Sequence, residues 1–269
     1  MQSEKKSKLS VALFLMRNPT WSKEFVRRVK VNAARRMLPP PMGQSRAVAE
    51  AWAAQHAVDV DEAFTRLGLD PSAIRTLEQD QPGMLEEAAR KEASAKEKMG
   101  GGGSADLIYA LCQALNVRTA VETGVAYGYS SLAILSAVSK LGGHLQSVDM
   151  PHIWSRDRSQ VGIVVPPTLR PFWTLLQCPD SIGLDKALRA AQPLDFCHYD
   201  SDKSYEGRSW GYRQMWNALR PGGTFMSDDI GDNTAFRDFT AEIGVEPIVV
   251  NAPGAGTSGA RFIGIVVKP

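Results

Sequence analysis

The chain has 269 residues, of which 43% are hydrophobic and 22% charged, and its formal net charge is +2. This length allows one sizeable core and an appendage, and the composition excludes a fibrous or wholly disordered protein. The three cysteines are too few and too scattered for a disulfide framework or a zinc site, so we expect a reducing, cytoplasmic location.

Residues 1–41 are expected to form a basic amphipathic arm. Positions 1–40 hold ten Lys or Arg residues against two Glu residues, which leaves the rest of the chain net negative. Apolar residues recur at roughly helical spacing from Leu9 to Met37, and three prolines at 39–41 end any helix. The apolar stretch 9–16 is too short to cross a bilayer and lacks a signal-peptide cleavage site. The arm is a solvated helix, or it contacts an anionic membrane surface, a partner or a second copy of the chain.

Residues 42–103 are expected to be a helical extension. They are rich in Ala, Glu and Lys, with breaks at 68–71 and 82–83, and they end in a flexible glycine run at 100–103. We find no catalytic cluster in this part of the sequence. Ser104 can cap a helix over 105–115, so the catalytic domain is expected to span 104–269.

From Val117 onward, short apolar runs alternate with helical stretches, a pattern typical of βαβ units. The last two apolar runs are joined by a Gly-rich stretch that suits an antiparallel hairpin. The sequence therefore predicts an α/β, Rossmann-like sheet, mostly parallel with an antiparallel last strand. The expected strands are 119–123, 145–149, 173–177, 195–199, 223–227, 247–250 and 262–267, with helices at 130–141, 181–191 and 205–219.

The run from Glu122 to Ser130 leaves a strand and enters a helix. Glycines at such a turn let the backbone pass close to a ligand, and the helix N-terminus offers unpaired N–H groups. The G-x-G-x-x-G spacing of nicotinamide dehydrogenases is absent, which disfavours that class. The alternative is a tight turn without a ligand. The candidate cofactor contacts in this run are Glu122, Gly124, Ala126, Tyr127, Gly128 and Ser130.

Two further positions point to an adenosine ligand. Asp149 ends the next strand, about twenty residues on, where an acid can accept both hydroxyls of a ribose. Asp180 and Ser181 follow the third strand, where such sheets contact the adenine ring. The alternative for this pair is the ordinary preference of helix starts for Asp and Ser.

Three carboxylates are expected to converge beside the cofactor. Asp200 ends the fourth strand, and Asp228 with Asp229 ends the fifth, so all three lie at the same edge of a parallel sheet. Clustered carboxylates raise one another's pKa unless a cation neutralises them. Oxygen ligands without Cys or His suit Mg²⁺, so these three acids are the candidate metal ligands.

These features together resemble the class I S-adenosylmethionine-dependent methyltransferases over residues 104–269. The 122–130 run resembles the first cofactor motif of the catechol and caffeoyl-CoA type O-methyltransferases. The downstream half is similar to a bacterial group found with sugar and natural-product pathways. The residues that carry this second likeness are 196–205 (FCHYDSDKSY), 219–223 (LRPGG) and 227–229 (SDD).

The resemblance implies S-adenosylmethionine as cofactor and a metal, bound by Asp200, Asp228 and Asp229, that holds two acceptor oxygens. It also implies that Lys203, three residues after Asp200, is the general base with a depressed pKa. The bacterial group more often has His at this position, which leaves open which residue takes the proton. The structural alternative is an exposed Lys203 that pairs with Asp202.

Several other candidate site residues could equally have a structural role. His198 could serve as a base, but a His within an apolar strand is more often a core residue. The loop 151–171 holds Trp154 and basic residues that would suit an anionic acceptor, or it is an ordinary surface loop. The remaining candidates are His152, which could reach the site, Arg156 and Arg158 for an anionic acceptor, Asp202 as a helix cap, Tyr205 as a pocket residue and Asp195 as a structural acid.

The sequence thus predicts a Mg²⁺-assisted O-methyltransferase for a small hydroxylated acceptor, such as a sugar or natural product. One alternative is a metal-independent methyltransferase whose acids bind the acceptor directly. Another is a non-catalytic module that docks through its basic N-terminus. A nucleic-acid substrate is disfavoured because the catalytic domain is not basic.

Overall fold

A computed structural model of the chain describes residues 8–37, 44–100, 103–151, 153, 155, 157–252 and 261–269. Its centre is an eight-stranded sheet in the order β1-β7-β8-β6-β5-β2-β3-β4. Neighbouring strands pair in parallel except β8, which runs antiparallel to β6 and β7. The strands are β1 (Ala57–Val58), β2 (Thr119–Thr123), β3 (His144–Asp149), β4 (Trp173–Gln177), β5 (Leu194–Tyr199), β6 (Leu219–Ser227), β7 (Ile248–Asn251) and β8 (Phe262–Val267).

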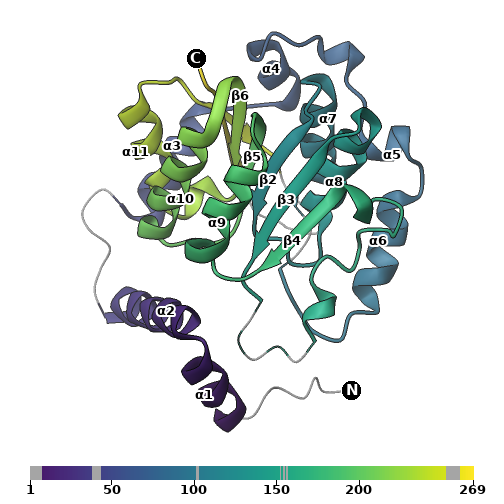
Figure 1. The fold of residues 1–269 in the computed structure, drawn as a ribbon. Helices are drawn as coiled ribbons and strands as arrows, with labels where there is room; N and C mark the ends of the chain where they lie inside the picture. The colour runs from purple at the N-terminus through teal and green to yellow at the C-terminus, as the bar shows by residue number, and fades with distance from the viewer. Residues whose placement is uncertain are drawn as a thin grey trace.

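Helices cover both faces of this sheet (Figure 1). On one face α7 and α8 pack with β2 and β3 into one buried apolar cluster, and on the other α9, α10 and α11 form a second with β5 and β6. Burial on both faces explains why the central strands read as continuous apolar runs. These five helices are α7 (Ala105–Ala114), α8 (Tyr129–Val138), α9 (Asp180–Ala190), α10 (Tyr205–Ala218) and α11 (Ala235–Ile243).

The N-terminal part of the chain is helical apart from one short strand. Helices α1 and α2 form a separate pair beside the main body, whereas α3 to α6 lie against it (Figure 1). Short 3₁₀ turns complete the fold at 71–73, 139–141, 158–160, 170–172 and 230–232. The helices are α1 (Lys8–Arg17), α2 (Pro19–Met37), α3 (Arg46–His56), α4 (Val60–Arg66), α5 (Leu77–Asp80) and α6 (Met84–Ala93).

The structure confirms the expected α/β sheet with its antiparallel last strand and helical N-terminal region. Strand β6 begins four residues before the predicted start, because Leu219 already pairs with Leu194 of β5. Two elements were not expected: α11, and β1, which pairs with β7 and brings part of the helical extension into the sheet. The boundaries predicted at 41 and 103 stay predictions.

Among the described residues, no helix is long and apolar enough to span a membrane.

Candidate functional site

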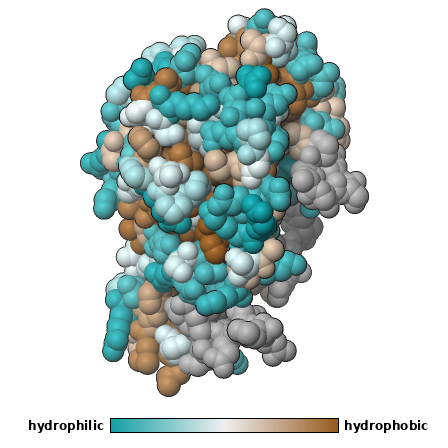
Figure 2. Space-filling model, turned by 90° about the vertical axis from the view of Figure 1, so that its right-hand side faces the viewer, coloured by the Kyte–Doolittle hydropathy of each residue, from teal (hydrophilic) through white to brown (hydrophobic). Residues whose placement is uncertain are grey.

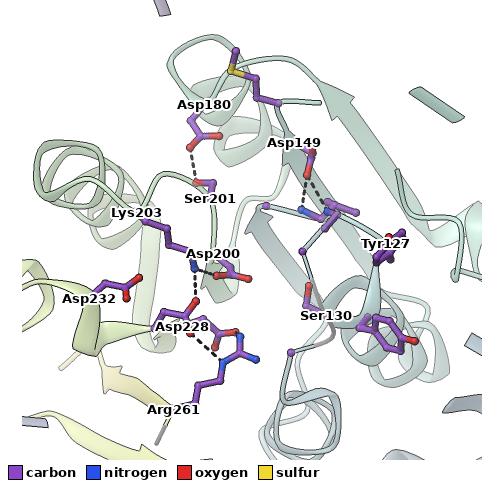
Figure 3. Close-up of a pocket in the computed structure, with 18 of the residues that line it drawn as sticks. Tyr127, Ser130, Asp149, Asp180, Asp200, Ser201, Lys203, Asp228, Asp232 and Arg261 are labelled. Atoms are coloured by element: carbon purple, nitrogen blue, oxygen red, sulfur yellow. Dashed lines mark hydrogen bonds and ion pairs between the residues drawn. The ribbon is translucent and has the colours of Figure 1, made fainter. Parts of the chain in front are cut away.

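A cavity of about 570 Å³ opens at the carboxyl edge of the sheet. Its walls come from the turn after β2 and from the ends of β3, β5 and β6, together with the start of α9 (Figure 3). Nine side chains and two glycines from the sequence prediction line it, and we divide them into two halves. The cofactor half contains Gly124, Ala126, Tyr127, Gly128, Ser130, Asp149 and Asp180, and the acceptor half contains Asp200, Lys203, Asp228 and Asp229.

The turn after β2 requires glycine for its packing against the protein. Gly124 has φ +81°, and a Cβ there would overlap the backbone carbonyl of Asp200. Gly128 has φ +98°, and a Cβ there would come within 2.9 Å of the Cα of Gly162. Ala126 also has a positive φ, of 49°. Packing of the turn against neighbouring loops therefore requires its two glycines.

Glu122 does not line the cavity, contrary to its prediction as a cofactor contact. It is fully buried beneath the turn, where its carboxylate accepts hydrogen bonds from the hydroxyls of Ser130, Ser131 and Ser147. The bond from Ser130 is 3.0 Å long and that from Ser147 is 2.8 Å. The acid therefore fixes the start of α8 against β3, because each of its bonds ends on one of these two elements.

Asp149 holds the same turn from the neighbouring strand. Its Oδ2 accepts the backbone N–H groups of Val125 at 2.7 Å and Ala126 at 3.0 Å. Burial raises the pKa of this carboxyl, and the two N–H donors offset only part of the effect. Asp149 thus stabilises the turn and also presents its carboxylate to the cavity (Figure 3).

Asp180 carries an unpaired oxygen at the cavity wall. Its Oδ2 accepts the hydroxyl of Ser201 at 2.5 Å, whereas Oδ1 is buried and has no hydrogen-bond partner among the described residues. Burial raises the pKa of this carboxyl to about 6. A buried acceptor without a donor is costly, so Oδ1 is suited to a ligand N–H or O–H group. Ser181, its predicted companion, is exposed and lies outside this cavity.

Tyr127 connects the turn to the helical extension. Its hydroxyl donates to the carbonyl of Glu97 at 3.0 Å and accepts the N–H of Met99 at 3.0 Å. Tyr129 next to it donates to Glu92 at 2.6 Å. Residues 92–99 are therefore fastened beside the cavity, and Gly100 and Gly103 just after them line it.

The acceptor half is a network of acids and cations (Figure 3). The Nζ of Lys203 donates to Oδ1 of Asp200 and, at 2.8 Å, to Oδ2 of Asp229. Arg261 donates to Oδ2 of Asp228 at 2.6 Å, and its Nε lies 3.2 Å from Oδ1 of Asp229. The three predicted acids do converge, and two cations lie among them.

The pKa of Lys203 is raised, not depressed as the resemblance implied. Burial alone would lower it, but the carboxylates of Asp200 and Asp229 outweigh this effect. Lys203 is therefore an ammonium group at neutral pH. In contrast, burial raises the pKa of Asp200 to about 6, with a contribution from Asp228. Asp200 is a carboxylate at neutral pH and can accept a proton.

The remaining two acids are stabilised in their ionised form. Burial opposes this form, but His198, Arg261 and Lys203 together hold the pKa of Asp228 at about 2. Lys203 and Arg261 likewise lower the pKa of Asp229. Repulsion among the acids is therefore already relieved by side chains of the protein.

This arrangement does not fit the Mg²⁺ site that the sequence predicted. A divalent cation among the three acids would have to displace Lys203 and Arg261 or lie beside their positive charges. Within the ranges that the structure describes, no group of three or more His, Cys, Asp or Glu side chains is arranged to hold a metal ion. The charge argument for a metal therefore fails.

His198 is a core residue, but a charged one. It is fully buried outside the cavity, with Nε2 3.6 Å from Asp228 and Nδ1 3.9 Å from Glu122. Burial lowers its pKa, but these two carboxylates outweigh that effect and raise it to about 10. His198 thus connects Glu122, beneath the turn, to Asp228 of the acceptor half, and it is not placed to act as a base on a ligand.

The other candidates have structural roles or lie elsewhere. Asp202 accepts the N–H of Ser204 at 2.9 Å, next to the start of α10. Tyr205 donates to Asp238 and does not line the cavity, and Asp195 accepts N–H groups of Arg118 and Thr119, as a structural acid would. His152, Trp154 and Arg156 lie outside the described residues.

Arg158 does not line the cavity either. Its guanidinium lies 5.1 Å from the ring centre of Phe14 and 4.9 Å from that of Trp21. It therefore binds the N-terminal helices, and the prediction that it selects an anionic acceptor has no support in the structure.

Several residues that line the cavity were not predicted from the sequence. Arg261 and Phe262 stand at the start of β8, and the antiparallel pairing of β8 with β6 brings them beside Asp228. Arg46 and Glu50 come from α3, and Arg28 from α2. None of these five lies in a recognisable motif. The antiparallel hairpin was the one available signal, because the start of its second strand must lie at the end of β6.

The sheet order defines an α/β protein with the Rossmann-like topology, and its cavity lies at the carboxyl edge, where such sheets bind their ligands. Residues 121–230 match a family described as a methyltransferase domain. A search of curated proteins finds no match. Over residues 121–230 the chain is similar to a methyltransferase domain, and the sheet around them has the Rossmann-like fold that the sequence predicted.

Solved structures with this fold include three that cover most of the chain. Cofactor-bound Rv0187 from MTB is 16% identical with a TM-score of 0.56, covering 71% of this chain and 93% of its own. An O-methyltransferase from Bacillus cereus in complex with SAH is 19% identical, with a TM-score of 0.54. The match covers 80% of this chain and 100% of that one. The third is the O-methyltransferase TomG from Streptomyces achromogenes, involved in tomaymycin synthesis, in complex with SAM. It is 16% identical with a TM-score of 0.51, and the match covers 81% of this chain and 99% of that one.

Proposed function

We propose that the protein transfers the methyl group of S-adenosylmethionine to a hydroxyl of a small acceptor. The observation that carries the proposal is the division of the cavity into two unlike halves. One half has a backbone turn with the acids Asp149 and Asp180, and the other has the Asp200–Lys203 pair. Two of the similar structures are O-methyltransferases, which adds support for the choice of oxygen.

The cofactor half would hold the adenosine part. Oδ2 of Asp149 is used by the turn, so its Oδ1 would accept a ribose hydroxyl. Oδ1 of Asp180 would accept an N–H of the exocyclic amino group of adenine, which would supply the donor that this buried oxygen lacks. Gly124 and Gly128 would contribute through the shape of the turn.

When bound, S-adenosylmethionine supplies a methyl group whose carbon bonds to the acceptor oxygen as its bond to the positively charged sulfur breaks. Asp200 would take the proton that the acceptor hydroxyl loses, since its carboxylate is ionised at neutral pH and its pKa is raised to about 6. Lys203, as an ammonium, would stabilise negative charge that develops on that oxygen. This assignment reverses the base role that the resemblance gave Lys203.

We propose that the reaction proceeds without a divalent cation, the alternative that the sequence left open. Lys203 and Arg261 supply the positive charge in the acceptor half. Once an acceptor is found, methylation should continue in the presence of a chelator. Loss of activity with EDTA and its return with Mg²⁺ would instead support the metal-assisted route.

Calorimetric titration with S-adenosylmethionine tests the cofactor. We expect binding that is lost in Asp149→Ala and retained in Asp185→Ala, a change at an exposed acid of α9. Thermal unfolding of both variants controls for misfolding, because Asp149 also supports the turn. Absence of binding by the unmodified protein would contradict the proposal.

Formation of S-adenosylhomocysteine tests the acceptor. A panel of catechols, other phenols, sugars and matching amines should give product with hydroxyl compounds and none with amines. Mass spectrometry then checks that the methyl group is on oxygen. Methylation of amines alone would support the alternative in which the acids bind an amine directly.

We also propose a cytoplasmic location. The three thiols are unpaired, with Cys112 and Cys197 fully buried and Cys178 half-buried. Burial raises the pKa of each thiol, which keeps it in the unreactive form. A reducing compartment suits such residues.

A further inference from the structure

Helices α1 and α2 have one side that binds the body of the protein. Arg27 donates to Asp202, just before the N-terminus of α10, and at 2.7 Å to Glu24 on its own helix. The guanidinium of Arg158 lies over the rings of Phe14 of α1 and Trp21 of α2, and Trp21 is buried. The helix pair is therefore held against the body by an ion pair and by cation–π contacts.

The same helix pair borders the cavity. Arg28, next to Arg27 on α2, is one of the residues that line it, and its Nε donates to Glu24 at 2.8 Å. Whatever covers the outside of α1 and α2 therefore lies next to the cavity wall.

The opposite side of the pair exposes large apolar residues, and we call it the outer face. Three of them on α1 stand at positions i, i+4 and i+7, and those on α2 follow a similar stripe, so each set shares one side of its helix. Figure 2 shows apolar residues on the surface of the lower part of the molecule, where α1 and α2 lie in Figure 1. The residues and their exposed fractions are Leu9 72%, Leu13 41%, Met16 70%, Val26 48%, Val29 50% and Met37 81%.

The charge beside this apolar stripe has one sign. Lys8, Arg17, Lys23 and Lys30 are exposed on the two helices. Glu24 is the one acidic residue between positions 8 and 37, and it is buried and paired with Arg27 and Arg28. The outer face is therefore apolar and basic, without an exposed acid.

We propose that the outer face binds an anionic lipid surface. An apolar stripe flanked by Lys and Arg is the pattern of helices that lie in the membrane interface, with the apolar side in the acyl boundary and the cations near lipid phosphates. Two short helices can bind only reversibly, which agrees with the absence of a spanning helix among the described residues. The charge complementarity favours an anionic bilayer over a second copy of the chain, since two basic faces would repel each other.

Flotation of the full chain with vesicles tests the proposal. We expect the protein to float with phosphatidylcholine vesicles that contain phosphatidylglycerol, and to stay behind with phosphatidylcholine alone. Added salt should weaken the binding, because it screens the exposed charges.

Two variants of the outer face and two matched controls sharpen the test. Leu13→Asp/Met16→Asp and Lys23→Glu/Lys30→Glu should each lower vesicle binding by about tenfold or more. Val60→Asp on α4 and Lys186→Glu on α9, both exposed positions, should bind as the unmodified protein does. An unchanged midpoint of thermal unfolding shows that each variant is folded, so the flotation result does not depend on the proposed cofactor or methyl transfer.

Three outcomes would overturn the proposal. The first is no flotation with either vesicle, and the second is flotation that the outer-face variants leave unchanged. The third is a dimer in sedimentation velocity that Leu13→Asp/Met16→Asp dissociates, which would assign the outer face to a second copy of the chain.

Discussion

At the scale of single residues, the buried oxygen of Asp180 links cofactor affinity to pH. Burial raises the pKa of this carboxyl to about 6 in the protein without cofactor. A donor from the exocyclic amino group of adenine would bind the carboxylate better than the protonated acid, so binding lowers this pKa. Affinity for S-adenosylmethionine should therefore be constant above neutral pH and fall as the pH drops through 6. Calorimetric titrations from about pH 8 to about pH 5 measure this slope.

Asp180→Asn is the control for that prediction. The amide oxygen can still accept a hydrogen bond but does not titrate, so the variant should lose most of the slope. Asp149 also has a raised pKa, and its titration should leave a residual slope in the variant. An unchanged slope in Asp180→Asn would place the titrating group elsewhere.

Lys203 and Asp200 should shift each other's titration. In Lys203→Met the ammonium that lowers the pKa of Asp200 is gone, so this pKa should rise above 6. The acidic limb of kcat/KM should then move to higher pH, and kcat at neutral pH should fall by about 10²- to 10⁴-fold. A pH profile of methylation measures both effects, with Lys186→Met on α9 as the control. If the acidic limb of the kcat/KM profile stayed at the same pH, Asp200 would not be the proton acceptor.

His198 should contribute to stability through its charge. Its pKa is raised to about 10, so this contribution is complete below the unfolded value near 6.5 and is lost as the pH rises through 10. His198→Phe would leave Glu122 and Asp228 buried without their common cation, which should cost about 3–5 kcal/mol at neutral pH. Urea unfolding at several pH values measures this. The difference between the two proteins should shrink at alkaline pH, and a constant difference would indicate a packing effect alone.

At the scale of elements, the turn after β2 is specified by its packing. Gly124→Ala combines a strained φ of +81° with overlap against the carbonyl of Asp200. Gly142→Ala has a similar φ, +64°, but open space around the added Cβ. The control should lose about 1–2 kcal/mol of unfolding free energy from backbone strain. Gly124→Ala should lose a further ~1–3 kcal/mol and also cofactor affinity, as urea unfolding and calorimetry would measure. Equal losses in both variants would contradict the packing argument.

The elements of the sheet were predictable where apolar runs stand between turn residues. Strands β2, β4 and β8 have their predicted bounds, since each is a short run with apolar residues that a polar or turn residue ends. Strand β1 has only two residues, too few for any periodicity, and only its pairing with β7 defines it. Helix α11 was missed because no motif or turn signal was assigned between β6 and β7.

The site was predictable where topology alone decides. Asp149, Asp200 and Asp228 end parallel strands, so the sheet brings them to one edge whatever their side chains contact. Arg261 needed the register of an antiparallel pair, in which Ser227 faces Gly264. Without that cation the three acids seemed to need a metal. The metal prediction thus rested on the placement of the acids, without the contact that Arg261 makes with Asp228.

At the scale of the whole molecule, Arg158 connects two parts of the chain that are far apart in sequence. It was expected to select an acceptor, but its guanidinium packs on Phe14 and Trp21 of the N-terminal helices. Such contacts contribute about 0.5–2 kcal/mol each. Removing them should loosen α1 and α2 from the body while the acceptor half of the cavity stays intact, since Arg158 does not line it.

Arg158→Ala should therefore raise amide hydrogen exchange within residues 8–37 by about 5- to 30-fold, the ratio that one or two kcal/mol produces. The KM for the acceptor should not change, whether the acceptor is anionic or neutral. Arg189→Ala on α9, which removes an exposed pair with Asp185, should leave both quantities unaltered. If Arg158→Ala raised the KM of anionic acceptors only, Arg158 would be an acceptor-binding residue after all.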